Sequence, residues 1–479
     1  MKLIGLNIFF QIILVVLVCY PVYSQDSIPD LVSADSTIQN YIISSIEIEG
    51  NQKTRKGIII RELSFKEGDI LTLAELEMAF DESKNNLLKQ PLFNYVTFDK
   101  IIKDNGLIAI KIIVEERWFI WPQLFIINND RNFNSWWQTK DFSNLDYRLE
   151  VTQYNMLGLN HILRVELSYG YTRELTLSYK NIFLDKAQHH FLGVKGSYFQ
   201  QKSVFYRTYN NKQESYLSEK DALTGKHLRL EYSFRPRHKS RHSLFFSYNY
   251  LLADDSLVKV NPNFLANQNS QNSYFEMRYQ YVFDRRDSRS YPLTGNWIDI
   301  NLVKTGLGII PSQNINFFHI RATLKQFYKF SDNFYGAHSL SLKKTFENEQ
   351  PHYFRQGLGF LDYLRGFEYY VIDGQDYYLL KNTIKYNLLP TKISYLKFIP
   401  IKKFKKIHYA FYLTAYFDIG IAHEKNDEHI LNNTLSNKLL YSSGLGFDIA
   451  SYYDNVIRFE YSINSLGERG FFIHFKTSI

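Results

Sequence analysis

The chain has 479 residues, of which 45% are hydrophobic, 17% aromatic and 22% charged, and its formal net charge is +8. These values argue against a helical membrane protein, because no apolar run after the first 24 residues approaches the roughly 20 residues of a helical span. They also argue against nucleic-acid binding, since the basic residues are spread along the chain rather than gathered in one stripe.

Residues 1–24 have the pattern of a secretory signal peptide, with an apolar run from Ile4 to Val18. An uncleaved anchor helix is the alternative, but the run is short for a bilayer. Cys19 is the only cysteine, and the large Val18 before it argues against a lipid-attachment site. We therefore expect a mature chain without disulfides, in which residues 25–40 form a linker.

Residues 41–116 predict a small α+β domain in the order strand, two helices, two strands (βααββ). A capping box from Thr72 to Glu75 opens the second helix. An apolar stripe along that helix is expected to cover the sheet, and it consists of Leu76, Phe80 and Leu87.

Residues 117–479 alternate between apolar and polar side chains over many short segments, which is typical of a transmembrane β-barrel. In residues 227–235, "HLRLEYSFR", the leucines and aromatics share one face, which suits lipid, and the charged residues share the other. A soluble sandwich alternates as well, but soluble sheets of this extent divide into domains with visible linkers, and the sequence shows none. We therefore predict a transmembrane antiparallel β-barrel of about 16 strands.

The expected strands are separated by turn residues, and short connections alternate with long ones. Short turns are expected at the periplasmic end of such a barrel and long loops outside the cell. One connection, from about 390 to 407, is long although it falls on the short-turn side. The strands are predicted to begin near residues 118, 145, 161, 173, 189, 227, 242, 273, 295, 315, 333, 376, 408, 438, 456 and 470.

The N-terminal domain resembles a known module. "IEIEGNQKTRKGIIIRELSFKEGD", which includes Arg61-Glu62-Leu63, resembles the start of a POTRA (polypeptide-transport-associated) domain. The positions that carry the motif are Gly50, Asn51 and Gly68. The resemblance implies a single POTRA domain in the periplasm.

The C-terminal half resembles the outer-membrane assembly and translocation superfamily, the bacterial surface antigen family. "LGFLDYLRGFEYYVIDG" resembles its hallmark loop, with Arg365, Gly366 and Phe367 at the most recognisable positions. "AYFDIG" resembles a strand motif of the same family and supplies Asp418 and Gly420. Two turns, "YNMLGLNH" and "DRRDSRSYPLTGN", agree with this resemblance. The ending "ERGFFIHF" resembles a barrel sorting signal, with Gly470, Ile473 and Phe475 in alternation.

The resemblance gives Arg365 a role: the hallmark loop is expected to fold into the barrel lumen, where this arginine meets Asp418 on the wall. A buried guanidinium needs such a partner, because an unpaired charge is costly. Ile384 stands where relatives often carry a second acid, so we expect either a weaker pairing or help from one of three nearby carboxylates: Asp362, Glu368 or Asp373.

The resemblance also implies a function, the insertion of polypeptides into the outer membrane or their translocation across it. A lateral seam is expected between strands 118–128 and 470–479, and the POTRA sheet edge is expected to bind an extended client strand. Expected partners are outer-membrane lipid, an unfolded or exported polypeptide, and other assembly proteins. No catalytic residues, cofactor or metal site are predicted, and His189-His190 point to opposite faces of a strand. A passive pore or a structural surface barrel is the alternative.

Two basic clusters fall on connections of the predicted periplasmic rim, where anionic lipid headgroups attract cations by about 1 kcal/mol per residue. An acidic client domain is a second partner that these clusters would suit, and a purely solvated turn is the alternative in each case. The first cluster is Arg235, Arg237, Lys239 and Arg241. The second cluster is Lys397, Lys402, Lys403, Lys405 and Lys406.

Overall fold

The computed structural model describes residues 40–477 with several internal gaps. The signal peptide and almost all of the linker predicted above therefore lie outside the described residues, as do the final two residues. The internal gaps are residues 104–105, 129–133, 135–136, 138–139, 141–144, 186, 188, 311–314, 348–349, 396–405, 426–431 and 452–454.

The N-terminal domain is a four-stranded sheet with two helices, in the strand order β2-β1-β4-β3. The capping box of Thr72 and Glu75 is formed at the start of the second helix, and the predicted stripe of that helix is buried in the core. The elements are β1 (Tyr41–Glu49), α2 (Lys56–Ile60), β2 (Ile70–Leu71), α3 (Leu73–Leu88), β3 (Phe93–Ile102) and β4 (Leu107–Glu116).

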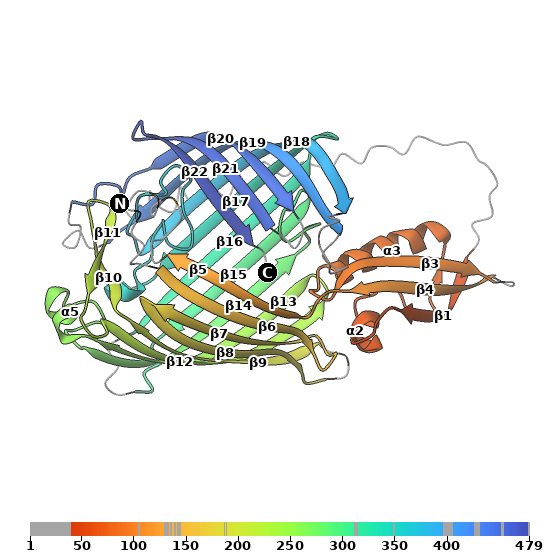
Figure 1. Cartoon of the computed structure of the whole chain (residues 1–479), viewed down its shortest axis with the longest axis horizontal. Coiled ribbons are helices and arrows are strands. Elements are labelled where there is room, and N and C mark those ends of the chain that lie inside the picture. Colours follow the sequence, from red (N-terminus) through yellow and green to blue (C-terminus); the bar gives the residue numbers. More distant parts are fainter. Residues whose placement is uncertain are drawn as a thin grey trace.

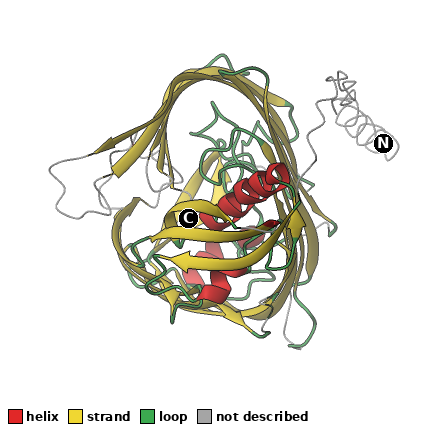
Figure 2. Cartoon of the chain, turned by 90° about the vertical axis from the view of Figure 1, so that its right-hand side faces the viewer, coloured by secondary structure: helices red, strands yellow, loops and turns green. Residues whose placement is uncertain are grey.

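The rest of the chain forms a 16-stranded antiparallel sheet in which neighbours in sequence are neighbours in space, apart from one inserted hairpin. Figure 2, seen from the side of the N-terminal domain, shows these strands enclosing a ring. The strands are β5 (Ile120–Asn128), β6 (Leu145–Met156), β7 (His161–Gly170), β8 (Thr172–Phe183), β9 (His190–Gln201), β12 (Leu223–Arg237), β13 (Ser240–Ala253), β14 (Gln271–Asp284), β15 (Gly295–Thr305), β16 (Phe317–Lys329), β17 (Phe334–Thr345), β18 (Asp376–Tyr395), β19 (Lys406–His423), β20 (Leu440–Ser451), β21 (Asn455–Asn464) and β22 (Arg469–Thr477).

The predicted barrel is confirmed, and so is the outward face of its strands. Leu228 and Leu230 on β12 are 52% and 55% exposed, as expected of side chains that face lipid. No helix among the described residues has the length and apolar composition needed to cross a membrane.

The N-terminal domain lies at the end of the barrel that carries the short turns, and the long connections lie at the opposite end (Figure 1). The long connections hold a hairpin and two short helices: β10 (Ser203–Tyr209), β11 (Lys212–Leu217), α5 (Asp255–Val260) and η3 (His352–Phe354). The long connection predicted at 390–407 needs correction, because its described ends continue β18 as far as Tyr395 and begin β19 at Lys406. These two strands pair over this extension with two register shifts, which the apolar alternation of the sequence does not reveal.

Candidate functional site: the barrel lumen and its two openings

Arg365 and Asp418 meet in the lumen. Arg365 lies in the connection between β17 and β18, residues 346–375, which we call the lumen loop. Its Nε donates to Asp418 Oδ2 at 2.7 Å, and its Nη2 donates to Asp418 Oδ1 at 2.6 Å. Arg365 is 3% exposed and Asp418 is fully buried on β19. The parallel pair of charge-assisted hydrogen bonds fixes the orientation as well as the position of the loop.

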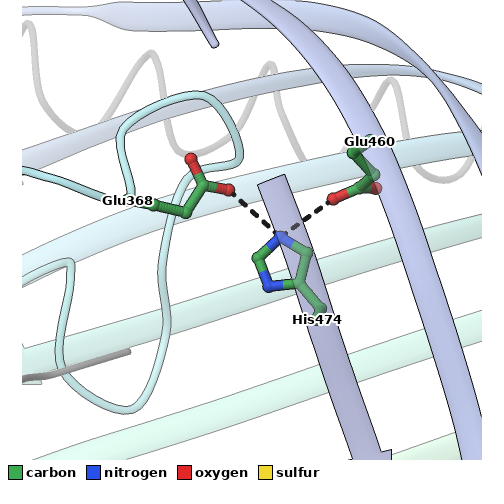
Figure 3. Close-up of side chains that lie close together, drawn as sticks. All are labelled: Glu368, Glu460 and His474. Carbon is green, nitrogen blue, oxygen red and sulfur yellow. Dashed lines mark ion pairs between the residues drawn. The ribbon is translucent and has the colours of Figure 1, made fainter. Parts of the chain in front are cut away.

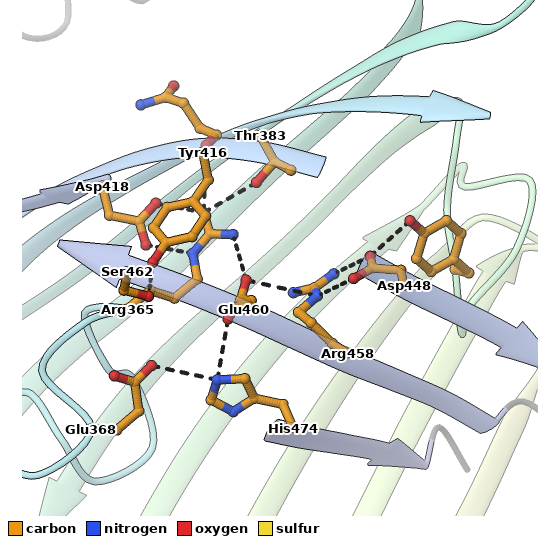
Figure 4. A network of polar contacts seen from close by, with 12 residues as sticks. Arg365, Glu368, Thr383, Tyr416, Asp418, Asp448, Arg458, Glu460, Ser462 and His474 are labelled. Carbon is orange, nitrogen blue, oxygen red and sulfur yellow. Dashed lines mark hydrogen bonds and ion pairs between the residues drawn. The ribbon is translucent and has the colours of Figure 1, made fainter. Parts of the chain in front are cut away.

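The second acid beside Arg365 is Glu460 on β21, which the sequence did not indicate. Arg365 Nη1 lies 3.4 Å from Glu460 Oε1, and the guanidinium carbon lies 3.8 Å from the centre of the Tyr416 ring (Figure 4). Ile384 is 53% exposed, so an acid at that position would not face this site. The pair of Arg365 and Asp418, which we call the clamp, is therefore supplemented by Glu460, which follows Arg365 by 95 residues in the chain.

Two of the three carboxylates expected to assist Arg365, Asp362 and Glu368, pair with other side chains. Asp362 accepts a hydrogen bond from Arg321 Nη2 at 2.9 Å and another from the Tyr377 hydroxyl at 2.6 Å. Glu368 faces His474 of β22, and Asp373 is buried in the lumen loop. The expectation for Asp362 and Glu368 is thus corrected: Asp362 pairs with Arg321, and Glu368 faces the imidazole of His474.

Gly366 and Phe367 also hold the lumen loop against the barrel wall. Gly366 has φ +81°, and a Cβ there would lie 3.2 Å from the Cβ of Ser442 on β20, so both the backbone angle and the close approach favour glycine. Its carbonyl accepts a hydrogen bond from Asn464 Nδ2 at 2.9 Å. Phe367 is 2% exposed, and it packs in an apolar cluster that includes Leu358.

A polar network continues from the clamp along the wall (Figure 4). Arg458 donates two hydrogen bonds of 2.8 Å to Asp448, and Asp448 also accepts a hydrogen bond of 2.8 Å from the Tyr291 hydroxyl. Glu460 stands between this pair and Arg365. Because each arginine has an aspartate of its own, Glu460 links two neutral pairs rather than neutralising one of them.

Two residues of the first basic cluster, Arg235 and Lys239, contact the N-terminal domain, which corrects their assignment to lipid headgroups. Arg235 at the end of β12 donates to both oxygens of Glu62, at 2.9 and 3.1 Å. Glu62 is fully buried and is also paired with Arg61, while Lys239 of the next turn binds Glu82 at 2.8 Å. Because Glu62 is buried away from water, its attraction to Arg235 is screened less than the attraction between a cation and a hydrated headgroup.

The pKa of Glu62 reflects this contact. Burial raises the pKa of the carboxyl group, but the charge of Arg235, a hydrogen bond with His238 and the charge of Arg61 together outweigh burial and hold the pKa well below its usual range. Glu62 therefore carries its negative charge at neutral pH in the docked domain.

A second contact joins the domains at the turn between β6 and β7. Asn155 Nδ2 donates to Thr54 Oγ1 at 2.8 Å, and the backbone N–H of Arg55 donates to the carbonyl of Gly158 at 3.0 Å. A Cβ at Gly158 would lie 2.2 Å from the carbonyl oxygen of Lys53, so the turn approaches too closely for a side chain. The N-terminal domain is thus fixed to two separate turns of the rim.

The second basic cluster lies almost entirely outside the described residues. Lys406 is the first residue of β19, and the other four lysines fall in the gap at 396–405. Their binding to anionic headgroups stays a prediction.

The two end strands of the barrel sheet form an incomplete junction. Among the described residues, no ladder joins β5 to β22, which stand at opposite ends of the strand order. The side-chain amide of Asn134, in the connection after β5, instead bonds to the backbone of Ile473 on β22. Asn134 Oδ1 accepts the Ile473 N–H at 2.9 Å, and Asn134 Nδ2 donates to the Ile473 carbonyl at 3.3 Å. At Ile473, the side chain of Asn134 thus makes the two hydrogen bonds that the backbone of a neighbouring strand would otherwise make.

The remaining predicted motif residues occupy turns and strands. Gly50 follows β1, Asn51 Nδ2 donates to the carbonyl of Thr54 at 3.0 Å, and Gly68 lies in the turn before β2. Gly420 lies on β19 against the lumen loop. On β22, Gly470 lies on one face of the strand, while Ile473 and the 63% exposed Phe475 lie on the other. Their role as a sorting signal stays a prediction.

The long connections contact one another beyond the lumen. Asn433 Nδ2 donates to the Thr208 carbonyl at 2.9 Å, and its Oδ1 accepts the Asn211 N–H at 2.7 Å. The carbonyl of Asn211 in turn accepts the N–H of Val371 in the lumen loop at 2.8 Å. The hairpin β10–β11, the connection after β19 and the lumen loop are thereby joined.

Comparisons with known proteins agree with this architecture. The profile described as POTRA, "Surface antigen variable number repeat", matches residues 41–117, and the Omp85 superfamily domain matches residues 155–470. The structure is similar to BamA from Haemophilus ducreyi lacking POTRA domains 1-3, at 15% identity and a TM-score of 0.53, covering 91% of this chain and 83% of that one. It is also similar to CdiB from Acinetobacter baumannii, at 14% identity and a TM-score of 0.51, covering 91% and 73%. No curated protein matches the sequence significantly.

Proposed function

This chain belongs to the Omp85 superfamily, and from that membership we propose that it inserts polypeptides into the outer membrane or translocates them across it. The barrel lies in the outer membrane and its single POTRA domain lies in the periplasm. Members of the superfamily are transport and assembly factors rather than enzymes, and we propose no catalytic activity for this chain.

The observation that carries the proposal is the junction between β5 and β22, which we call the seam. A barrel gains nothing in stability from an unpaired edge, because the backbone groups there lack strand partners. The bond pair from Asn134 to Ile473 is easier to exchange than a full ladder, since it involves one side chain. A client strand that offers its own backbone to β22 would make the same two bonds and continue them along the edge.

The POTRA domain offers a second edge for a client. β3 stands at one end of the POTRA sheet and pairs only with β4 in the strand order. Ile101 and Ile102 near its end are 56% and 52% exposed. An extended polypeptide that adds to β3 would gain main-chain hydrogen bonds with little sequence preference, which suits a carrier of many clients.

The contacts among the long connections count against a passive pore. Bonds between Asn433, Asn211 and the lumen loop join segments from three parts of the barrel at its outer end. Conduction through the lumen would require these segments to part, and so would translocation by that route, whereas lateral release through the seam would not.

Cross-linking the seam should abolish activity. We expect a bismaleimide bridge between cysteines at Leu124 of β5 and Phe471 of β22, both with exposed side chains, to lower client assembly at least about tenfold, because the edge can no longer open. The measurement is the assembly of an unfolded outer-membrane barrel protein into liposomes that hold the purified variant. Bridges of several lengths allow for the span between the strands.

A matched control is the pair Leu445→Cys and Tyr461→Cys. These residues stand directly opposite each other on β20 and β21, which are already joined by a ladder, and both are exposed. Bridging them should leave activity unchanged. Full activity after complete cross-linking of the seam would instead favour the passive or structural barrel.

A further inference from the structure

Three side chains from three segments converge beside the Arg365 clamp. Glu368 comes from the lumen loop, Glu460 from β21 and His474 from β22, and one nitrogen or oxygen of each lies within 4.8 Å of the others. His474 Nε2 is 3.1 Å from Glu460 Oε2 and 3.4 Å from Glu368 Oε1. Figure 3 shows both carboxylates directed at the same ring nitrogen. This is the one group of its kind in the part of the chain that the structure describes.

Direct hydrogen bonding does not satisfy the contact between Glu460 and His474. A ring nitrogen carries at most one hydrogen, which cannot point at two carboxylates at once. Within the described residues, Glu460 Oε2 and His474 Nε2 have no hydrogen bond of acceptable geometry. Glu460 is fully buried, and a buried carboxylate oxygen without a donor carries the full cost of its lost hydration.

The neighbouring arginines do not remove that cost. Arg365 and Arg458 approach Glu460 through its other oxygen, Oε1, at 3.4 and 3.9 Å. Each of them is already engaged by an aspartate through two hydrogen bonds. Oε2 of Glu460 is therefore the oxygen that faces the imidazole of His474, as the dashed line in Figure 4 shows.

We propose that Glu368, Glu460 and His474 bind a divalent transition-metal cation of the Zn²⁺ type. Bonds of about 2.0–2.2 Å around a tetrahedral ion place ligand atoms about 3.4 Å apart. The distances of 3.1 and 3.4 Å from His474 Nε2 match these edges. A mixed set of imidazole and carboxylate ligands favours Zn²⁺ over Mg²⁺ or Ca²⁺, which prefer oxygen alone.

The cation would replace two poorly directed contacts by three bonds and would leave its fourth position to water. His474 is 16% exposed at its side chain, which gives the ion a route of entry. Because the three ligands come from the lumen loop and from the last two strands, the ion ties the loop to the edge of β22. The site stands independently of the proposed transport function, since cation binding requires no client.

The test is cation binding by the purified barrel in detergent after treatment with a chelator. We expect one equivalent of Zn²⁺ to bind in calorimetry, and Co²⁺ at the same site to show the visible absorption bands of a four-coordinate ion. His474→Gln and Glu368→Gln should each lower the affinity for Zn²⁺ at least about tenfold, because loss of a direct ligand costs at least as much as loss of an outer partner.

His319→Gln is the matched control. This imidazole lines a cavity of about 360 Å³ together with the cationic Arg321 and Lys343, a setting that disfavours a metal ion, so the affinity should not change. Equal Zn²⁺ affinity in the His474 variant and the unaltered protein would overturn the proposal. The unaltered protein also decides the question without any variant, because absence of a saturable equivalent of Zn²⁺ would overturn it regardless of how the variants fold.

Discussion

Arg365→Ala should destabilise the folded barrel by about 3–5 kcal/mol, the usual cost of leaving one partner of a buried ion pair alone. The change would leave Asp418, which is fully buried, without its two charge-assisted bonds. Asp418→Ala should cost a similar amount for the reciprocal reason. The free energy of unfolding can be measured by urea titration of the barrel in detergent or lipid vesicles.

The double variant should lose less than the sum of the two single changes, because both remove the same interaction. Strictly additive losses would contradict the pairing. Arg365→Lys tests the geometry, since an ammonium keeps the charge but cannot form the two parallel bonds. Arg229→Ala is the control: this wall arginine hydrogen-bonds to Ser247 Oγ, and its loss should cost about 1 kcal/mol.

The strands of the barrel were predictable because alternation of lipid-facing and lumen-facing side chains is a local signal. The predicted strand starts differ from the observed ones by four residues at most, at 227 against Leu223. The largest error concerned 390–395, where the strand continues through register shifts that break the alternation. A bulge adds a residue to one strand without changing its composition, so a count of alternating positions misses it.

The clamp was half predictable. Arg365 and Asp418 were paired through a family resemblance, whereas Glu460 and His474 were missed although both lie in segments whose alternation was evident. Alternation tells which residues face the lumen but not which of them stand side by side. That depends on the stagger between strands and on the path of the lumen loop, and neither is encoded within one strand.

The basic turn around Arg235 was misinterpreted for a related reason. A cluster of cations in a short turn is consistent with lipid headgroups, with water or with a partner domain, and only the position of Glu62 selects among them. The POTRA motif contained that glutamate. Its contact with Arg235, at a separation of 173 residues, depends on how two domains meet.

Glu62→Ala should release the POTRA domain from the barrel rim. Glu62 is fully buried and accepts both Arg235 bonds, so its removal leaves Arg235 and Arg61 close together without an intervening negative charge. A loss of about 3 kcal/mol, the lower end for a broken buried pair, would lower the equilibrium constant for docking more than a hundredfold. To measure this, one spin label is placed on α3 and another on the β8–β9 side of the rim. The distribution of distances between the two labels should change from one narrow peak to a wide distribution.

The exposed pair of Lys239 and Glu82 supplies the control for that experiment. Their side chains are 37% and 44% exposed, so Lys239→Ala should cost at most about 1 kcal/mol and leave the distance distribution narrow. A charge reversal, Glu62→Arg with Arg235→Glu, restores attraction between the two positions but leaves Arg61 beside a new cation, so it should recover docking only in part. An unchanged narrow distribution in Glu62→Ala would show that the turn contacts of Asn155 and Gly158 hold the domain alone.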